Sequence, residues 1–232
     1  MFIMRICIFY SSPKLGDIIL QLPFIKAISV HFNKKVILCI NQNINIQNIL
    51  QKQNYIDSVI VNPFRRGRFF LNDVFKLSKI LKQKNIDCAF ILEKTKGTAI
   101  ACKLAKVEKI FGFGIGSQKF LVENFSRLKK NDLRYNYTYQ SIKFLNFHKI
   151  SYNFNDNFLI LDQIEKIKFK KKYESLPKPW VCFAVDSTEV NRIWPQKNFA
   201  ELADKLINKN LAKTIFIINH ENHKKYFDEV IS

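Results

Sequence analysis

The sequence has little acidic charge and no long apolar run. Of its 232 residues, 19 are Asp or Glu and 38 are Lys or Arg, which gives a formal net charge of +19. A run of about 18 apolar residues, the shortest expected for a membrane-spanning helix, does not occur. The first residues also lack a signal-peptide layout, because Arg5 lies inside the first apolar stretch. We therefore expect a cytoplasmic protein.

Cysteine and histidine are too few and too scattered for a fold that depends on disulfide bonds or on a bound metal. The 5 cysteines are odd in number and follow no disulfide or zinc spacing, so buried free thiols are expected. They are Cys7, Cys39, Cys88, Cys102 and Cys182. His220 and His223 form one close pair, without a neighbouring ligand pattern, and a solvent-facing loop explains them better than a metal. The sequence predicts no metal and no resident cofactor.

The basic excess is concentrated in the middle of the chain. Residues 61–150 contain 19 basic and 6 acidic residues, whereas 151–232 contain 13 and 11. Codon bias in an AT-rich genome would explain scattered lysines, but not the cluster Arg65, Arg66 and Arg68. Net charge alone also admits a nucleic-acid-binding protein. No recognised nucleic-acid module is apparent and the aromatic residues are not interleaved with the basic cluster, so we expect no nucleic-acid partner.

Apolar segments typical of strands and of helices alternate along the chain. A hydrophobic share of 47% is ample for a core of one or two domains. Short apolar runs predict strands at 6–10, 36–40, 58–62, 87–92, 109–114, 180–185 and 214–218. Helical spacing predicts helices at 17–28, 71–84, 98–105, 135–147, 164–173 and 197–207. This alternation is typical of an α/β fold with a parallel sheet.

The alternation is interrupted once, near residues 162–178. A lysine-rich helical stretch is followed there by Pro177 and Pro179, which mark a boundary. We therefore expect a first domain at 1–161, a linker helix and boundary at 162–178, and a second domain from 179 to 232. A doubly wound domain needs about 100–150 residues, so this second domain is expected to be incomplete.

The first strand leads into a polar loop and then a helix. Ser11-Ser12-Pro13 ends the strand, and Gly16-Asp17 precedes the apolar helix. Such a loop lies at the carboxyl edge of a parallel sheet, where open α/β folds bind ligands. Asp17 is therefore a candidate for chemistry. The local sequence also allows a simpler interpretation, in which Asp17 caps the helix and Gly16 eases the turn.

The segment SSPKLGDIILQLPFIKAIS resembles the N-terminal signature of the family-9 glycosyltransferases, the ADP-heptose:lipopolysaccharide heptosyltransferases and their relatives. The positions in register are Gly16, Asp17, Leu20, Pro23, Ile25 and Ala27. The resemblance implies a GT-B architecture, with two Rossmann-like domains, and a nucleotide-sugar donor such as ADP-heptose. It makes Asp17 the general base and places Ser12 and Gly16 at the acceptor. The family's later donor loop, which contains Asp, Gly and His, has no counterpart in this sequence.

A second segment, Asp186 to Pro195, is similar to the family's donor-phosphate segment, in which a basic residue precedes Trp-Pro. By that resemblance Ser187 and Thr188 bind phosphate oxygens and Arg192 neutralises the leaving diphosphate. Hydroxyls, free backbone N–H groups and a cation form a reasonable anion site. The simpler interpretation has Trp194-Pro195 as a helix-start staple and Arg192 as a surface charge.

A third segment carries Arg65, Arg66 and Arg68 after the third predicted strand. By resemblance to the heptosyltransferases this loop meets an anionic inner-core acceptor, and Lys94 and Lys96, after the next strand, extend the patch. Arginine pairs well with carboxylate and phosphate groups, and such a patch also draws a protein to an anionic membrane. A solvated basic turn is the alternative.

These features together predict an inverting glycosyltransferase that moves a heptose or related sugar onto an anionic lipopolysaccharide acceptor. It would be peripheral at the cytoplasmic face of the inner membrane. Two alternatives remain open at this point. One is a relative that binds an anionic glycolipid without transferring sugar, and the other is a basic nucleic-acid-binding protein.

Overall fold

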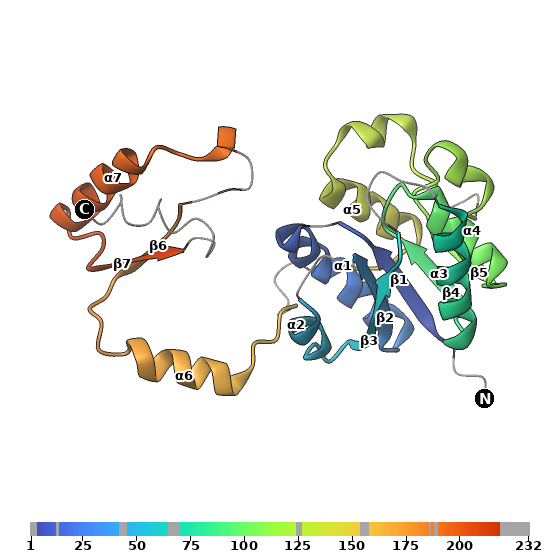
Figure 1. The fold of residues 1–232 in the computed structure, drawn as a ribbon, viewed down its shortest axis with the longest axis horizontal. Coiled ribbons are helices and arrows are strands. Elements are labelled where there is room, and N and C mark those ends of the chain that lie inside the picture. The colour runs from blue at the N-terminus through green and yellow to red at the C-terminus, as the bar shows by residue number, and fades with distance from the viewer. Residues whose placement is uncertain are drawn as a thin grey trace. The chain divides into compact units, whose positions relative to one another are not determined.

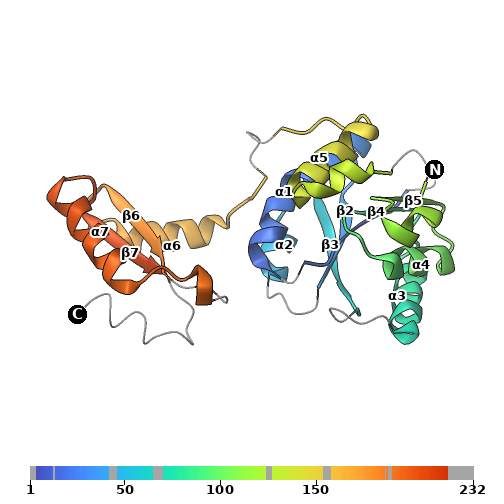
Figure 2. The same ribbon diagram turned by 90° about the horizontal axis from the view of Figure 1, so that it is seen from above.

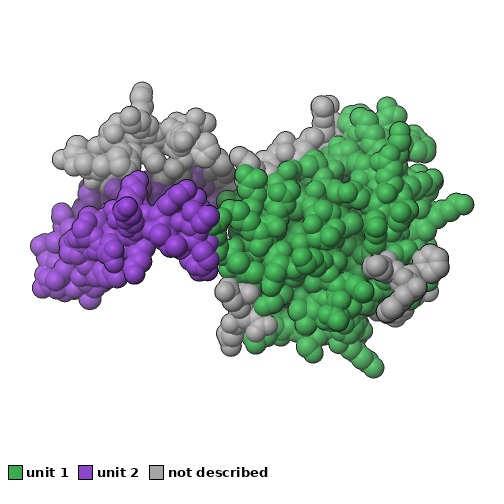
Figure 3. Space-filling view, turned by 90° about the horizontal axis from the view of Figure 1, so that it is seen from below, with its two compact units in different colours: residues 1–162 green, residues 163–232 purple. Residues whose placement is uncertain are grey.

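The computed structural model describes residues 4–12, 14–41, 46–64, 70–123, 127–153, 158–185, 187 and 190–218. It divides into two compact units, residues 1–162 and 163–232, which are coloured separately in Figure 3. The first unit contains the central sheet and the second contains a small sheet of its own (Figure 1).

The first unit is built on a parallel sheet of five strands. Their order across the sheet is β3 (Ile56–Asn62), β2 (Val36–Asn41), β1 (Ile6–Tyr10), β4 (Cys88–Ile91) and β5 (Lys109–Gly112). β1 is central and fully buried, as its continuous apolar run predicts. The strand order reverses direction between β1 and β4. In open α/β sheets this switch point is where ligands bind.

Helices cover both faces of this sheet (Figure 2). They are α1 (Leu15–Phe32), α2 (Gln47–Gln51), α3 (Leu71–Gln83), α4 (Lys96–Leu104) and α5 (Tyr137–Phe147), with short 3-10 turns η1 (Gly116–Phe120) and η3 (Lys130–Arg134). Side chains of α1, α2 and α5 pack on one face, and those of α3 and α4 pack on the other. The α/β class and the parallel sheet expected from the sequence are confirmed.

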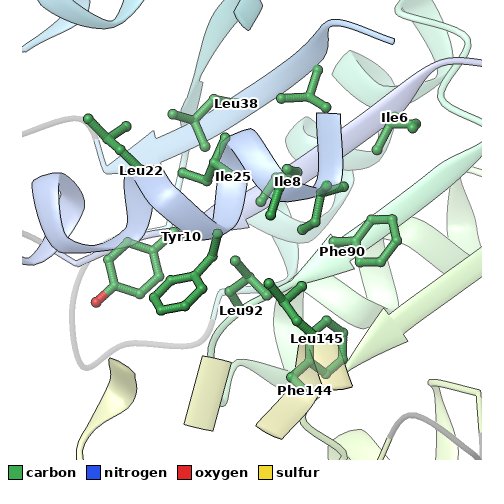
Figure 4. Close-up of a cluster of buried hydrophobic side chains, with 14 of the residues drawn as sticks. Ile6, Ile8, Tyr10, Leu22, Ile25, Leu38, Phe90, Leu92, Phe144 and Leu145 are labelled. Carbon is green, nitrogen blue, oxygen red and sulfur yellow. The ribbon is translucent and has the colours of Figure 1, made fainter. Parts of the chain in front are cut away.

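Alternate residues of each strand supply the two apolar layers, because successive strand side chains point to opposite faces. In β1, Ile6, Ile8 and Tyr10 face α1 and α5, whereas Cys7 and Phe9 face α3 and α4. Figure 4 shows the first layer, in which side chains of α1, the strands and α5 converge. The packing of α1 against the sheet and α5 holds this helix in place, and its first turn contains Gly16 and Asp17.

Helix α1 is, within the residues that the structure describes, the one helix long and apolar enough to cross a membrane by length and composition. Half of that helix is buried. Ile18, Leu22, Ile25 and Ile28 are in contact with the sheet layer and are almost fully buried. Packing on a sheet covered on both faces accounts for the apolar character of this helix.

Four of the five cysteines are buried free thiols, as predicted, and the fifth is not. Cys7, Cys39, Cys88 and Cys102 lie in the first unit, and burial raises the pKa of each thiol. Cys182 is exposed, so the prediction is wrong for it. Cys182 lies in a strand of a two-stranded sheet, Trp180–Ala184. In that strand the next residue, Phe183, is the one that is buried.

The second unit contains α6 (Gln163–Tyr173), β6 (Trp180–Ala184), the short turn η4 (Val190–Arg192), α7 (Gln196–Asn208) and β7 (Thr214–Ile218). β6 and β7 pair in parallel. The lysine-rich helix α6 has no buried residue, which fits a solvated helix face. Rings of Tyr173, Trp180 and Phe216 pack edge to face and join α6 to the small sheet.

Candidate functional site

A cleft of about 320 Å³ opens at the carboxyl edge of the central sheet, next to the switch point. It is bounded by the loop after β1, the start of α1, the loop after β4 and the start of α5. Its lining residues are Tyr10, Ser11, Ser12, Lys14, Asp17, Glu93, Lys94, Thr95 and Tyr137. Two carboxylates, two lysines, hydroxyls and aromatic rings therefore meet in one cavity. A cavity in which a few polar and charged groups converge is the usual form of a ligand site.

Asp17 lines this cleft and is half-buried. It is the third residue of α1, because the helix begins at Leu15 and Lys14 holds the N-cap position. Asp17 is therefore not the cap residue, as the simpler interpretation had it. Its Oδ2 atom accepts a hydrogen bond of 2.5 Å from the Ser12 hydroxyl. Ser12 and Asp17, both predicted at the site, are thus brought together.

Gly16 has an ordinary helical backbone, so it does not serve to ease a turn as the simpler interpretation had it. A Cβ atom added at Gly16 would meet nothing within 4 Å. Neither backbone strain nor crowding within the first unit requires glycine here. The open space beside Asp17 is compatible with the approach of a ligand.

Glu93 is the functional candidate that the sequence reasoning missed. It follows β4 and is almost completely buried, at 9% exposure, yet it lines the cleft. Its Oε2 atom accepts the Ser11 backbone N–H at 2.8 Å, and its Oε1 atom accepts the Thr95 hydroxyl at 2.9 Å. Burial raises the pKa of Glu93, while hydrogen bonds from Ser11, Thr95 and Thr98 oppose that shift. A carboxylate directly after a buried strand was the available sequence signal.

Two tyrosines contribute neutral polar groups to the cleft. Burial raises the pKa of Tyr10, and the neighbouring carboxylate of Asp17 raises it further. Tyr10 thus keeps its proton at neutral pH and can donate a hydrogen bond. Tyr137, at the start of α5, is about half exposed, and the Lys94 ammonium lies 5.6 Å from its ring centroid. Lys94 and Tyr137 therefore form a cation–π contact in the lining of the cleft.

The predicted acceptor residues are only partly gathered at the cleft. Lys96 is exposed at the first position of α4 and does not line the cleft, whereas its neighbour Lys94 does. Arg65, Arg66 and Arg68 lie outside the described residues. The roles of all four in acceptor binding stay predictions.

The predicted donor segment lies in the second unit. Ser187 and Arg192 are described, with Arg192 exposed at the end of η4, while Thr188 lies outside the described residues. Trp194 directly precedes the N-cap residue of α7, Pro195. The ring centroids of Trp194 and Phe199 lie 4.9 Å apart. This is the geometry of a hydrophobic staple, so the simpler interpretation holds for Trp194. The phosphate-binding roles of Ser187, Thr188 and Arg192 stay predictions.

Among the described residues, no group of three His, Cys, Asp or Glu side chains is arranged to hold a metal ion. The cationic side chains that line the cleft are those of Lys14 and Lys94.

Three solved structures share this fold. The glycosyl transferase family 9 protein from Veillonella parvula DSM 2008 matches with a TM-score of 0.73 at 17% identity, over 99% of this chain and 66% of that one. E. coli ADP-heptose lps heptosyltransferase II matches with a TM-score of 0.69 at 15% identity, over 98% and 68%. E. coli heptosyltransferase WaaC, solved with ADP-2-deoxy-2-fluoro heptose, matches with a TM-score of 0.66 at 14% identity, over 99% of this chain and 73% of that one. The chain thus spans 66% to 73% of the length of these proteins.

No curated protein sequence matches the chain. Its residues 74–231 match the sequence profile of glycosyltransferase family 9 (heptosyltransferase). The match begins after the Gly16-Asp17 segment, so it is independent of that segment, and it includes the segment from Asp186 to Pro195. It also spans the end of the first unit and the described part of the second. With a profile match over more than half of its length and a GT-B fold shared with heptosyltransferases, the chain belongs to glycosyltransferase family 9.

Proposed function

We propose that the chain takes part in inverting sugar transfer from a nucleotide sugar to an anionic glycolipid, with Asp17 as the general base. Membership of the family supports sugar transfer in general. The observation that carries the proposal is a half-buried carboxylate in the cleft at the switch point of a parallel sheet. Asp17 is not the N-cap of its helix, so its carboxylate is available to a ligand.

In this mechanism Asp17 accepts the proton of an acceptor hydroxyl. The acceptor oxygen forms a bond to the anomeric carbon, and the bond from that carbon to the donor diphosphate breaks on the opposite face. The nucleoside diphosphate leaves with the electron pair of that bond. A single displacement inverts the anomeric centre and needs one carboxylate. The Ser12 hydroxyl, at 2.5 Å, orients the Asp17 carboxylate for this step.

The proposed donor is ADP-heptose or a related nucleotide sugar. Two solved structures of one relative support this choice, because E. coli WaaC was solved with ADP and with ADP-2-deoxy-2-fluoro heptose. Ser187 and Thr188 would bind the diphosphate oxygens, and Arg192 would stabilise the negative charge that develops as the diphosphate leaves. These residues belong to the second unit.

The proposed acceptor is an anionic inner-core lipopolysaccharide. Lys14 and Lys94 in the cleft supply positive charge for a carboxylate or phosphate substituent. Arg65, Arg66 and Arg68, with Lys96, would extend this charge and hold the protein at the cytoplasmic face of the inner membrane.

Substitution of Asp17 tests the proposal. Asp17→Asn keeps the size of the side chain but cannot accept the proton, so we expect transfer to fall by about 10²- to 10⁴-fold. The assay measures transfer from ADP-heptose to a deep-rough lipopolysaccharide acceptor. Asp57→Asn is the matched control, because Asp57 is an exposed carboxylate in β3 that does not line the cleft.

The outcomes separate the proposal from its alternatives. Undiminished transfer by Asp17→Asn would remove Asp17 from the role of base. Wild-type protein that binds the acceptor but transfers no sugar would indicate a non-catalytic glycolipid-binding relative. Tight, strongly salt-dependent binding to RNA or duplex DNA would favour a nucleic-acid-binding protein instead.

A further inference from the structure

Each polar group of Ser11 is bound by a residue from the end of a different strand. The Ser11 N–H donates to Glu93 Oε2 at 2.8 Å, after β4. The Ser11 hydroxyl accepts from Asn62 Nδ2 at 2.7 Å, and Asn62 is the last residue of β3. The Ser11 carbonyl accepts from Asn41 Nδ2 at 3.4 Å, and Asn41 is the last residue of β2. Residues at the ends of β3 and β2 and after β4, on both sides of β1 in the sheet, therefore fix one residue of the loop after β1.

The orientation of the Asn62 amide is set by a second hydrogen bond. Its Oδ1 atom accepts the Phe64 backbone N–H at 3.1 Å, so its Nδ2 group faces Ser11. Asn41 and Asn62 are both buried. A buried amide bound at both ends has little freedom to move.

Glu93 is also held firmly. Gln118, which is fully buried in η1, donates from Nε2 to the carbonyl oxygens of Glu93 and Thr95, each at 3.0 Å. The Oε1 atom of Gln118 accepts a hydrogen bond of 2.8 Å from the Gly114 N–H. The backbone that carries the Glu93 carboxylate is thus anchored to the turn after β5, and the carboxylate presents a fixed acceptor to Ser11.

The hydrogen bonds continue from Ser11 to the proposed base. Ser12 is the next residue, and its hydroxyl donates to Asp17 Oδ2 at 2.5 Å. We propose that Glu93 is a positioning residue, which holds the Ser11-Ser12 loop so that Ser12 orients the Asp17 carboxylate in the cleft. Its effect on transfer rests on the proposed function of Asp17, whereas its hold on the loop does not.

Loss of the Glu93 carboxylate would leave the Ser11 N–H without its acceptor in a half-buried loop. A buried donor without an acceptor is unfavourable, so the loop would leave this conformation for one in which water can accept the Ser11 N–H. Asp17 would then lose the fixed position of Ser12. A misplacement of about 1 Å in a reacting group can lower a rate about 10²-fold.

The experiment compares Glu93→Ala, Glu93→Gln and Glu108→Ala in two measurements. The first is amide hydrogen exchange at Ser11 by NMR, and the second is the kcat and KM of sugar transfer. Glu93→Ala removes the acceptor, whereas Glu93→Gln keeps a carbonyl oxygen that can accept the same N–H. Glu108→Ala is the matched control, because it removes an exposed carboxylate that does not line the cleft.

We expect Glu93→Ala to exchange the Ser11 amide at least about tenfold faster and to lower kcat by about 10- to 100-fold, with the donor KM unchanged. Glu93→Gln and Glu108→Ala should stay within about threefold of the wild type in both measurements. If Glu93→Ala does not fold, as judged by circular dichroism, Glu93→Asp takes its place. Its shorter side chain withdraws the carboxylate from the Ser11 N–H, and the same two effects are expected.

Two results would overturn the proposal. Unchanged exchange at Ser11 in a folded Glu93→Ala protein would show that Glu93 does not hold the loop. An unchanged kcat with a raised acceptor KM would show that Glu93 binds the acceptor directly. A wild-type chain that transfers no sugar, but in which Glu93 protects Ser11 as expected, would instead refute the proposed function and leave the hold on the loop standing.

Discussion

Gly16 and Gly112 differ in what a methyl group would meet. At Gly16 an added Cβ atom has open space, whereas at Gly112 it would lie 2.9 Å from Val122 Cγ1 and 3.3 Å from the Gln118 side chain. Gly112 is the last residue of β5, and its lack of a side chain lets Gln118 approach the sheet. Gly112 is therefore needed for packing within the unit. Gly16 is not needed for packing among the described residues of this unit.

This contrast predicts opposite effects of alanine on stability. Gly16→Ala should raise the free energy of unfolding by about 0.5–1 kcal/mol, because alanine favours helix. Gly112→Ala should lower it by about 1–3 kcal/mol through overpacking. Urea denaturation measures both. If an acceptor passes over Gly16, Gly16→Ala should also raise the acceptor KM. A destabilised Gly16→Ala protein would contradict the assignment of open space.

At the scale of elements, α5 joins the core to the cleft. Phe144 and Leu145 are fully buried against the sheet, and Tyr137, at the other end of the helix, lines the cleft. His148 directly follows α5, with its ring 4.6 Å from Phe144 and 4.7 Å from Phe111. The packing at this end of α5 therefore contains a titratable group.

Burial of His148, with a smaller contribution from His31, lowers its pKa from 6.5 to about 4. Between these values the unfolded chain binds a proton at this residue that the folded chain does not. The contribution of neutral His148 to stability is thus present above about pH 6.5 and is lost as the pH falls towards about 4. We expect the melting temperature to drop between pH 7 and pH 4.5 by less in His148→Phe than in the wild type. Equal drops in the two proteins would contradict a buried neutral imidazole.

At the scale of the whole molecule, the effect of the overall positive charge can be distinguished from the effect of one basic cluster. The chain carries a formal net charge of +19. In the lysine-rich helix α6, Lys168 pairs with Glu165 at 3.0 Å and Lys170 with Glu174 at 3.8 Å, all on an exposed surface. Exposed pairs of this kind contribute little to stability. The lysines of α6 can therefore be replaced without loss of fold.

Vesicle binding then distinguishes the arginine cluster from bulk charge. One variant replaces Arg65, Arg66 and Arg68 with Gln, and its control replaces Lys170, Lys171 and Lys172 with Gln, which removes the same charge. We expect the arginine variant to lose more binding to phosphatidylglycerol vesicles in a sedimentation assay, by about 1 kcal/mol per residue at low salt. Equal losses would show that net charge alone draws the chain to the membrane.

Much of the fold followed from hydrophobic periodicity. The strands at 6–10 and 214–218 have the predicted bounds, and the helix predicted at 71–84 is α3. These elements are determined locally, because the spacing of apolar side chains on a strand or helix is a property of the segment itself. The contact between Ser12 and Asp17, both predicted at the site, has the same local basis, because the two residues are five positions apart on either side of one short loop.

The sequence by itself determined the α/β class, the order of the elements and the position of Asp17 at the carboxyl edge of a parallel sheet. Only the tertiary structure decided that Glu93, Asn62 and Asn41 meet at Ser11, and that Lys94 rather than Lys96 lines the cleft. The physical reason is distance along the chain. Glu93 lies 82 residues from Ser11, and the two become neighbours only because β4 pairs with β1 in the folded sheet.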